Sequence, residues 1–428
     1  MADLRSFRGF RYDLGQVGSL SNAVCPPYDV IDAALQAKLY DASPYNAIRI
    51  ELTQDLPGDN EQNNKYIRAA STLKEWIHAD VLKQDTARSL YVYEQEFTVE
   101  GKTLTRRGFL ARVRLEPFGT GRIFPHEQTL SGPKADRLSL YKATNFNISP
   151  VFGLYPDDGE AFAILDPLIR NRPPLEATDH LGVVNRLWVV TDSAAISAII
   201  GHLGPKPVFI ADGHHRYETG LKYREEQGEL DDEHPANFCL MMLVSMSDPG
   251  LRILPTHRLV SGFSNATADA IEKALSPHFE IIGRFDSGKL CWEHLQMDGG
   301  QDVLGFGTKA DGKWMAVKLK DPAIMGTLAP DQSAEWRSLA VSILHKLVLE
   351  KLLPASLGGT ATCQYVHLMK EVEDAMAAKS CDVAYLVPPC EMMHVESIAG
   401  NREKMPPKST YFYPKILTGM VLHSLKKE

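Results

Sequence analysis

The chain has 428 residues, of which 44% are hydrophobic and 23% are charged. This composition is typical of a globular domain protein, and the length is sufficient for two or three core-forming units. The formal net charge of -8 at pH 7 argues against non-specific binding along a nucleic-acid backbone, because such binding needs clustered Lys and Arg to replace counterions. No nucleic-acid partner is therefore expected.

The cysteines and the first residues bear on compartment and metal content. The six cysteines are scattered, without a C-x-x-C pair or a zinc-like spacing to histidine. Most are expected to be small buried side chains in a reducing compartment, and no protein-bound metal site is predicted. The start of the chain is too polar for a secretory signal, and no apolar run approaches the ~20 residues needed to span a bilayer. A cytoplasmic protein without a membrane partner is expected, and its oligomeric state is not determined by the sequence.

Helical and strand patterns take turns along the chain. Residues 63–82 have the periodicity of an amphipathic helix, and residues 89–115 predict two antiparallel strands around a turn at 100–102. Residues 186–192 read as a strand, and residues 236–246 have the continuous apolarity of a strand buried on both faces. These alternations predict an α/β (mixed α+β) fold.

The last third of the chain changes in character. Residues 278–285 and 302–320 indicate strands and turns, with residues 305–313 as a hairpin turn because they lack the spacing of a nucleotide-binding loop. Residues 333–353 predict one long amphipathic helix. Three regions are expected: an N-terminal α+β region at 1–155, a core at 156–262 and a C-terminal α+β region at 263–428.

One motif combines several phosphate-binding features. Asp212, Gly213, His214, His215 and Arg216 stand where an apolar stretch gives way to a helical pattern. A helix N-terminus offers N–H groups and a positive dipole end, so this position suits an anion, phosphate above all. Asp212 is expected to cap the helix, Gly213 to allow a tight turn, and Arg216 to offer a planar charged fork. The histidines could donate to phosphate or relay a proton; a surface helix start with solvated basic groups is the alternative.

The sequence ADGHHRYET resembles the D-G-H-H-R signature of the ParB/sulfiredoxin-like superfamily, most closely that of the free L-serine kinases. Over nearly its whole length the chain is also similar to a widespread family of bacterial and archaeal proteins of unknown function that carry the same signature. That second similarity includes PPYDVI (26–31), PHEQTL (125–130), PTHRLV (255–260) and KMPPKSTYFYPK (404–415). The resemblance implies a ParB/sulfiredoxin-like phosphate-binding core with large insertions, ATP or ADP as the cofactor held by residues 212–216, and Mg²⁺ bridging its phosphates.

The kinase resemblance also implies a catalytic base. The serine kinases use a glutamate N-terminal to the signature to take the serine hydroxyl proton, and Glu127 is the candidate here, with His126 and His215 as the other catalytic residues. About eighty residues separate Glu127 from the signature, much farther than in the compact kinases. Asp29 therefore stays open as a competing carboxylate, with a turn aspartate as its structural alternative.

The expected substrate site draws on distant segments. Its residues are Asp29, Arg137, His257, Arg258, Lys408, Ser409 and Thr410. His257 and Arg258 follow a predicted strand and could form the far wall of the pocket, with an ordinary strand end as the alternative. KMPPKSTYFYPK is expected to fold over the signature, since a phosphorylated ligand of charge about -2 needs more than one Arg; aromatic packing with exposed lysines is the alternative.

The sequence thus predicts phosphotransfer between a nucleotide and a small hydroxylated metabolite, with serine or phosphoserine favoured. Positioning and charge neutralisation dominate such chemistry, which suits a site rich in His, Arg and Lys. A phosphohydrolase acting on phosphoserine, with water as the acceptor, is a second possibility. A nucleotide-binding regulatory protein like ParB is a third, but net acidity and the lack of a basic helix-turn-helix stretch count against it. In each case the partner is a small phosphorylated molecule.

Overall fold

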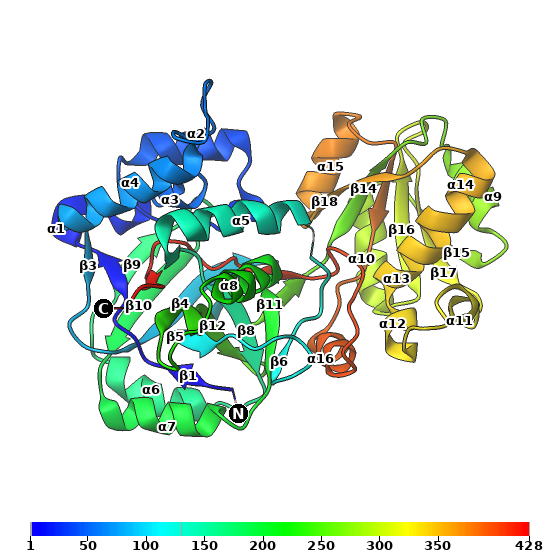
Figure 1. Ribbon diagram of the computed structural model, residues 1–428. Coiled ribbons are helices and arrows are strands. Elements are labelled where there is room, and N and C mark those ends of the chain that lie inside the picture. Colours follow the sequence, from blue (N-terminus) through cyan, green and yellow to red (C-terminus); the bar gives the residue numbers. More distant parts are fainter. Residues whose placement is uncertain (1, 130, 428) are drawn as a thin grey trace. The chain divides into compact units, whose positions relative to one another are not determined.

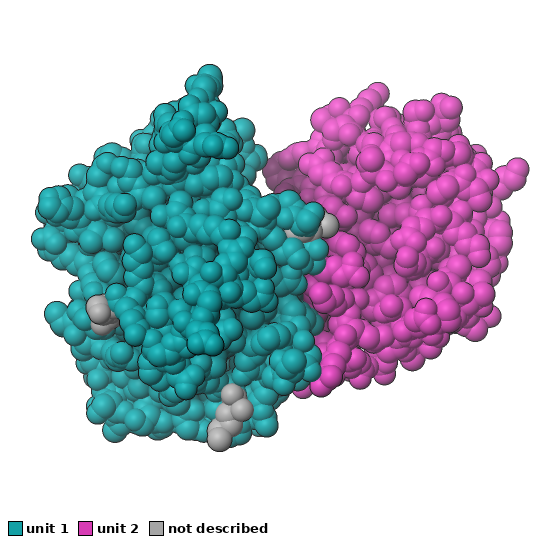
Figure 2. Space-filling view, viewed as in Figure 1, with its two compact units in different colours: residues 1–125, 129–251, 414–428 teal, residues 126–128, 252–413 magenta. Residues whose placement is uncertain are grey.

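The computed structural model describes residues 2–129 and 131–427 (Figure 1). Helices and strands alternate along it, so the predicted mixed α and β fold is confirmed. The chain divides into two compact units, shown separately coloured in Figure 2. Unit 1 comprises residues 1–125, 129–251 and 414–428, and unit 2 comprises residues 126–128 and 252–413.

Unit 1 is built on a nine-stranded mixed sheet. Its strands are β1 (Leu4–Arg5), β4 (Leu90–Val99), β5 (Lys102–Arg114), β6 (Ile123–Phe124), β8 (Val151–Tyr155), β9 (Leu175–Thr178), β10 (Val184–Val190), β11 (Val208–Asp212) and β12 (Phe238–Ser245). They follow the order β6-β11-β8-β12-β5-β4-β10-β9, with β1 added beside β5. Among the strands described, β6 with β11 and β8 with β12 are the parallel pairs of this sheet. The strand order places β11 next to the edge strand β6.

Helices cover this sheet and form the remaining layers of unit 1. They are α1 (Leu14–Val17), α2 (Ala33–Ala42), α3 (Ile48–Glu51), α4 (Lys65–His78), α5 (Ser131–Thr144), α6 (Glu160–Ile169), α7 (Ser193–Leu203) and α8 (His214–Glu226), with short 3-10 turns η1 (Leu20–Asn22), η2 (Tyr28–Val30) and η3 (Pro235–Asn237). Helices α6 and α7 bury Leu165 and Ile199 in one core with strand residues such as Met241, and Tyr217 of α8 joins the same core. Small strand pairs complete the unit: β2 (Phe10–Tyr12) with β3 (Leu82–Gln84), and β7 (Phe146–Asn147) with β21 (His423–Ser424).

Unit 2 is built on a six-stranded sheet in the order β15-β17-β16-β19-β14-β18. These strands are β14 (His257–Ser261), β15 (Phe279–Phe285), β16 (Val303–Thr308), β17 (Trp314–Leu319), β18 (Thr362–Val366) and β19 (Val383–Leu386), and a separate pair joins β13 (Arg252–Leu254) to β20 (Tyr411–Tyr413). Its helices are α9 (Ala268–Leu275), α10 (Gly288–Asp298), α11 (Ile324–Leu328), α12 (Ala334–Ser338), α13 (Ala340–Ile343), the π-helix η4 (Leu344–Leu352), α14 (Leu353–Leu357), α15 (Met369–Ala377) and α16 (Met392–Gly400).

Several local predictions are confirmed. The hairpin of β4 and β5, the helix α4, the fully buried strand β12 and the hairpin of β16 and β17 all form where the sequence patterns indicate. The six cysteines are free, and all except the half-buried Cys363 are buried. None of the helices described is both long enough and apolar enough to cross a membrane.

The predicted long helix at 333–353 is wrong as a single element. Leu339 is buried and extended (φ -67°, ψ 134°), so the segment breaks between α12 and α13 before continuing through η4 and α14. No Gly or Pro marks this break in the sequence. Packing of Leu339 into the unit 2 core overrides the local helical preference.

The region boundaries also differ from the expectation. Residues 1–155 and 156–262 share one sheet, because β4 and β5 pair with β10 and β12. Strands β13 and β14, which lie before the expected boundary at 262, pair with β20, β18 and β19 inside unit 2. Long-range strand pairing, which local composition does not report, sets the boundary at Leu251.

Candidate functional site

The D-G-H-H-R signature forms a strand, a one-residue turn and a helix, as its pattern predicts. Strand β11 ends at Asp212, Gly213 turns the chain with φ 87°, and α8 begins at His214. A Cβ on Gly213 would lie 2.9 Å from Nε of Arg216, so the turn requires glycine for two reasons: its backbone angle and its side-chain neighbour. His214 is buried and His215 is half-buried at the first turn of α8.

Asp212 does not cap α8 as expected, and it pairs with Arg216. Gly213, not Asp212, is the N-cap, and no side-chain cap bond to α8 is found among the described residues. Asp212 instead pairs with the buried guanidinium of Arg216, which also donates to the carbonyl oxygen of Pro150. Burial acts to lower the pKa of Arg216, but the carboxylates of Asp212 and Asp29 raise it above its ordinary value, so the guanidinium stays charged. Arg216 is thus a buried brace between strand and helix through its two terminal nitrogens, whereas its buried Nε has no hydrogen-bond partner among the described residues.

Two further cations surround Asp212. Nζ of Lys415 lies 2.5 Å from the Asp212 carboxylate, and the Lys415 side chain is only 11% exposed. Arg106 is fully buried on β5; it donates to the carbonyl oxygen of Pro414 at 2.5 Å and its charge acts on Asp212. Burial lowers the pKa of Arg106 to about 10, which leaves it protonated at neutral pH. Arg216, Lys415 and Arg106 thus bring three positive charges to the Asp212 carboxylate.

The PPYDVI loop belongs to the same corner. The guanidinium of Arg137 lies 4.2 Å from the centre of the Tyr28 ring, pairs with Asp136 at 2.6 Å, and donates to the carbonyl oxygen of Glu51 at 2.8 Å. Burial raises the pKa of the Tyr28 hydroxyl above its ordinary value; Asp29 raises it further, while Arg216 and Arg137 oppose this. Two of the expected substrate residues, Asp29 and Arg137, thus lie within electrostatic range of Tyr28, as Arg216 does.

Asp29 differs from the other carboxylates of this corner. It is exposed and makes no hydrogen bond to any residue that the structure describes. Its oxygens are open to a ligand, whereas those of Asp212 are bonded to cations.

The segment that carries PHEQTL divides between the two units. The segment begins directly after β6, which pairs with β11 of unit 1. The hydroxyl of Thr129 donates to the Glu218 carboxylate of α8 at 2.6 Å. Lys134 pairs with the same carboxylate at 2.7 Å. Residues 126–128 belong to unit 2. Leu130, the last residue of the motif, lies outside the described residues.

Within unit 2, PHEQTL and KMPPKSTYFYPK are joined. Glu127 accepts a hydrogen bond from the backbone N–H of Lys408 at 2.7 Å, and the buried ring of His126 bonds the hydroxyl of Thr410 at 2.8 Å. The carbonyl oxygen of His126 accepts from the N–H of Met405 at 2.7 Å. Segments about 280 residues apart thus form one structure. The expected catalytic pair and the expected substrate-binding loop are neighbours.

Arg258 hydrogen-bonds to the backbone of the KMPPKSTYFYPK segment. Its guanidinium is buried and donates to the carbonyl oxygen of Lys408 at 2.9 Å and to that of Thr256. Burial lowers the pKa of Arg258 to about 10, although the charge of Glu127 is among those that oppose the shift. Ser409 is turned inward, where its hydroxyl donates to the carbonyl oxygen of Pro406 at 2.6 Å. In Lys408 only the side chain is exposed to a ligand.

His257 has the surroundings of a core residue. Its ring is completely buried against Trp292, with ring centres 4.8 Å apart, and its Nδ1 accepts from the N–H of Val387. Burial lowers its pKa to about 3, so the ring is neutral near pH 7. This environment favours the alternative of an ordinary strand residue over the expected pocket wall.

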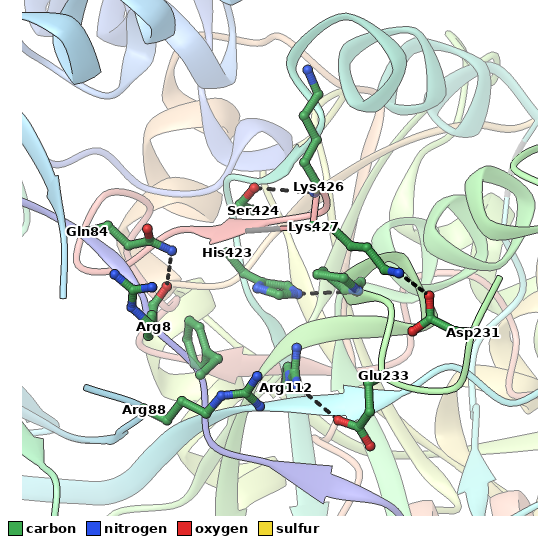
Figure 3. Close-up of a pocket in the computed structure, with 12 residues that line it drawn as sticks. Arg8, Gln84, Arg88, Arg112, Asp231, Glu233, His423, Ser424, Lys426 and Lys427 are labelled. Carbon is green, nitrogen blue, oxygen red and sulfur yellow. Dashed lines mark hydrogen bonds and ion pairs between the residues drawn. The ribbon is translucent and has the colours of Figure 1, made fainter. Parts of the chain in front are cut away.

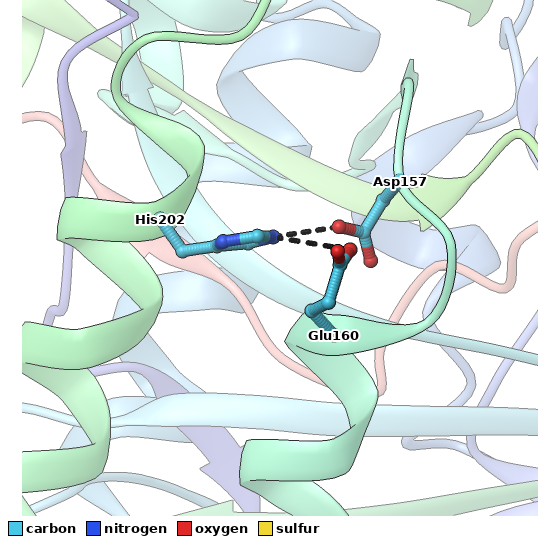
Figure 4. A group of neighbouring side chains, drawn as sticks. All are labelled: Asp157, Glu160 and His202. Carbon is cyan, nitrogen blue, oxygen red and sulfur yellow. Dashed lines mark hydrogen bonds and ion pairs between the residues drawn. The ribbon is translucent and has the colours of Figure 1, made fainter.

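One group of potential metal ligands occurs in unit 1, apart from the predicted residues. Asp157, Glu160 and His202 bring ligand atoms within 4.8 Å of one another (Figure 4). Asp157 already pairs with Nε2 of His202 and with Nζ of Lys206, each at 2.6 Å. The Lys206 ammonium already balances the charge of the Asp157 carboxylate. We therefore interpret Asp157, Glu160 and His202 as part of a structural ion-pair network.

Comparison with known proteins places the chain in a family. The profile of DUF1015, described as a protein of unknown function, matches residues 4–342. The chain belongs to the DUF1015 family. No curated protein matches its sequence.

Solved structures give weaker likenesses to this DUF1015 chain. A free serine kinase in complex with AMP matches with a TM-score of 0.34 at 12% identity, covering 68% of this chain and 83% of the kinase. A conserved hypothetical protein from Pyrococcus furiosus matches with a TM-score of 0.33 at 12% identity, covering 69% and 89%. SbnI from Staphylococcus aureus, truncated at its C-terminus, matches with a TM-score of 0.34 at 11% identity, covering 72% and 85%. These scores are too low to assign an activity.

Arg106 is the site residue that the sequence pattern did not reveal. It lies on a strand predicted as half of a hairpin, where an arginine is expected to face solvent. In the sequence it stands between Thr105 and Arg107, so local composition does not indicate that it is buried. Burial of a charge in the structure indicates a functional or ion-pairing role. Lys415, by contrast, stands within KMPPKSTYFYPK, the segment expected to approach the signature.

Proposed function

We propose that this DUF1015 protein transfers a phosphoryl group between a nucleotide, ATP or ADP, and a small hydroxylated metabolite, with serine or phosphoserine favoured. The observation that carries this proposal is the grouping of Arg216, Lys415 and Arg106 around Asp212 at the start of α8. A helix start with surplus positive charge is a suitable site for phosphate groups. The signature that shapes it is the segment through which the sequence resembles the free L-serine kinases.

The roles of individual residues follow from their environments. The buried Arg216 holds Asp212 and the turn in place, and the Lys415 ammonium brings a second positive charge to the same carboxylate. The half-buried His215 at the first turn of α8 is suited to donate to the transferred group. Hydrogen bonds and positive charge from these residues would stabilise the transition state, in which negative charge spreads over the phosphoryl oxygens.

The acceptor hydroxyl needs a base, and two carboxylates qualify. Glu127 is the proposed base; its bond from the Lys408 N–H fixes one carboxylate oxygen. Asp29 is the competitor, because it is exposed beside the cations of unit 1.

Mg²⁺ bound to the nucleotide would neutralise its phosphates, and it takes most of its ligands from phosphate oxygens and water. Asp29 fits as a protein ligand, since it is an exposed carboxylate without a hydrogen bond among the described residues. If Glu127 is the base, Asp29 is thus left to serve the metal.

The reaction can be tested by ³¹P NMR on the purified protein. It is incubated with Mg²⁺, with ATP, ADP or phosphoserine, and with a pool of hydroxylated metabolites that includes serine. Nucleotide consumed only in the presence of an acceptor is the expected result. Release of phosphate from phosphoserine alone would identify a hydrolase and contradict the proposal.

The phosphate site has its own test. Lys415→Ala should weaken nucleotide binding about 10- to 100-fold, because one charge-assisted hydrogen bond contributes ~1.5–3 kcal/mol. Lys222→Ala is the matched control, since Lys222 is exposed on α8 and pairs with Glu225. Equal dissociation constants for the two variants in calorimetry would show that nucleotide binds elsewhere.

A further inference from the structure

A cationic cavity lies in unit 1, and the signature residues are not among those that line it. Its volume is about 230 Å³, and Figure 3 shows the side chains that line it. It is formed where the segment between β1 and β2, the residues before β4, strand β5, the loop before η3 and the segment from β21 onward meet. Five chain segments distant in sequence thus contribute to one hollow.

The lining carries a surplus of positive charge. Its cations are Arg8, Arg88, Arg112, Lys426 and Lys427, and its carboxylates are Asp231 and Glu233. Five cations face two acids in a protein whose net charge is -8. A concentration of one sign in a hollow raises the local concentration of the opposite ion.

The existing ion pairs leave much of this charge unbalanced. Lys427 pairs with Asp231 at 2.6 Å. Glu233 lies 3.6 Å from both Arg112 and Arg5, so one exposed carboxylate is shared between two guanidinium groups. Arg88 and the ammonium of Lys426 make no hydrogen bond or ion pair with any described residue.

Arg112 forms the floor of the cavity. It is buried, with its guanidinium 4.6 Å from the centre of the Phe238 ring. The neighbouring His423 is buried too; burial and then the charge of Arg112 lower its pKa to about 3, so it adds no positive charge at neutral pH. Its Nε2 lies 3.4 Å from the carbonyl oxygen of Pro235. The cavity therefore owes its charge to arginine and lysine, which stay protonated throughout the physiological range.

We propose that this cavity binds a small dianion, recognised by the guanidinium forks of Arg88 and Arg112 with Lys426 at the rim. Planar guanidinium groups match the paired oxygens of carboxylate and phosphate. The size admits a phosphate ester or a dicarboxylate of a few carbons, whereas drug-sized ligands occupy about 300–1,000 Å³. The site is separate from the signature, because Arg112 lies six residues beyond Arg106 on β5, about 20 Å along the strand.

The test uses inorganic phosphate and succinate as probes, at constant ionic strength, with the full-length protein. Hydrogen–deuterium exchange should show protection at residues 231–235 and 423–427, and calorimetry gives the affinity. Arg88→Ala with Lys426→Ala should weaken binding about 2- to 30-fold, since each exposed charge contributes ~0.2–1 kcal/mol. Arg170→Ala with Lys74→Ala is the control, because it removes the same exposed charges elsewhere in unit 1.

The outcomes separate this cavity from the proposed phosphotransfer site. Protection there should persist in Lys415→Ala, which affects only the signature. Protection by both probes supports recognition of a dianion in general, and protection by phosphate alone supports a phosphate-bearing ligand. No protection by either probe, or an equal loss of affinity in the control pair, would overturn the proposal whatever becomes of the kinase hypothesis.

Discussion

At the scale of single residues, the signature arginine Arg216 has a structural role that the sequence motif alone does not indicate. Arg216 bonds Asp212 and the carbonyl oxygen of Pro150 while being only 3% exposed. A buried ion pair is not strongly stabilising by itself, but removing one partner leaves the other charge buried and uncompensated. Removal of the Arg216 guanidinium is therefore expected to lower the stability of the fold, separately from any effect on ligand binding.

Arg216→Ala should lower the free energy of unfolding by about 3–5 kcal/mol, the usual effect of breaking a buried pair. Urea denaturation measures this change. Arg224→Ala is the matched control, because Arg224 is exposed on the same helix and bonds Asn237; its effect should stay within about 0.5 kcal/mol. Equal urea midpoints for the two variants would contradict a structural role and would favour the expected role of Arg216 in binding a phosphate ligand.

The choice between Glu127 and Asp29 is also decided at single residues. Glu127→Gln keeps an oxygen that can accept the Lys408 N–H but cannot take a proton, so turnover should fall about 10²- to 10⁴-fold with an unchanged melting temperature. Steady-state kinetics of Glu127→Gln and Asp29→Asn measure the difference. A fall in Asp29→Asn alone would make Asp29 the base.

At the scale of elements, Asp157 links the start of α6 to the end of α7. It accepts from the N–H of Ala161 at 3.2 Å and pairs with His202 and Lys206 across the two helices. Burial acts to raise its pKa, but the hydrogen bonds from Lys206 and His202 outweigh burial and lower the pKa below its ordinary value. The carboxylate therefore stabilises the fold in its charged form.

Asp157→Asn should destabilise the protein by about 1–3 kcal/mol at pH 7. A lowered pKa gives a contribution that is complete above the unfolded value of about 3.9 and is lost as the pH falls below it. The difference between wild type and variant should thus shrink between about pH 4 and pH 2. Urea denaturation across this range checks it; a difference that grows on acidification would contradict the ion-pair interpretation.

The turn between β11 and α8 gives a second prediction at this scale. Gly213→Ala meets two penalties: a left-handed backbone, which costs about 1–2 kcal/mol, and contact of the new Cβ with Arg216. Gly228→Ala is the control, because Gly228 has φ 75° and open space around its Cβ position. Thermal unfolding should show the larger loss for Gly213→Ala, and equal losses would show that Arg216 yields without cost.

At the scale of the whole molecule, unit 2 is inserted near the end of unit 1. Residues 414–428 return to unit 1, where Leu422 bridges to Phe10, Thr418 bridges to Cys25, and β21 pairs with β7. The long segment of unit 2 begins at Arg252 and ends at Tyr413. These two ends are adjacent, because Arg252 pairs with Tyr413 across β13 and β20. Paired residues of antiparallel strands lie about 4.5–5.5 Å apart at their Cα atoms.

Replacing residues 252–413 by a linker of about four Gly and Ser residues should therefore leave unit 1 folded, with Lys415 beside Asp212. Circular dichroism and a cooperative thermal transition test the fold. Deleting residues 414–428 is the contrasting variant and should abolish cooperative unfolding, since it removes buried core residues such as Leu417 and Leu422. A folded protein after that deletion, or an unfolded one after the first, would contradict the assignment of units.

The sequence by itself determined the local elements and the residue types of the candidate site. The α4 periodicity, the hairpins and the buried strand β12 were predictable, because the patterns of apolar residues that define them lie within about twenty residues of one another. The strand, turn and helix of the D-G-H-H-R signature were predictable for the same reason, and Gly213 occupies the tight turn that its residue type indicated.

Only the tertiary structure decided how distant segments combine. It placed Lys415 on Asp212 and Lys408 on Glu127, turned Arg216 and Arg106 inward, neutralised His257 against Trp292, and broke the helix at Leu339. The physical reason is that burial and pairing of a charge depend on every element packed around it, and contacts across 200 or more residues leave no periodic trace in the sequence.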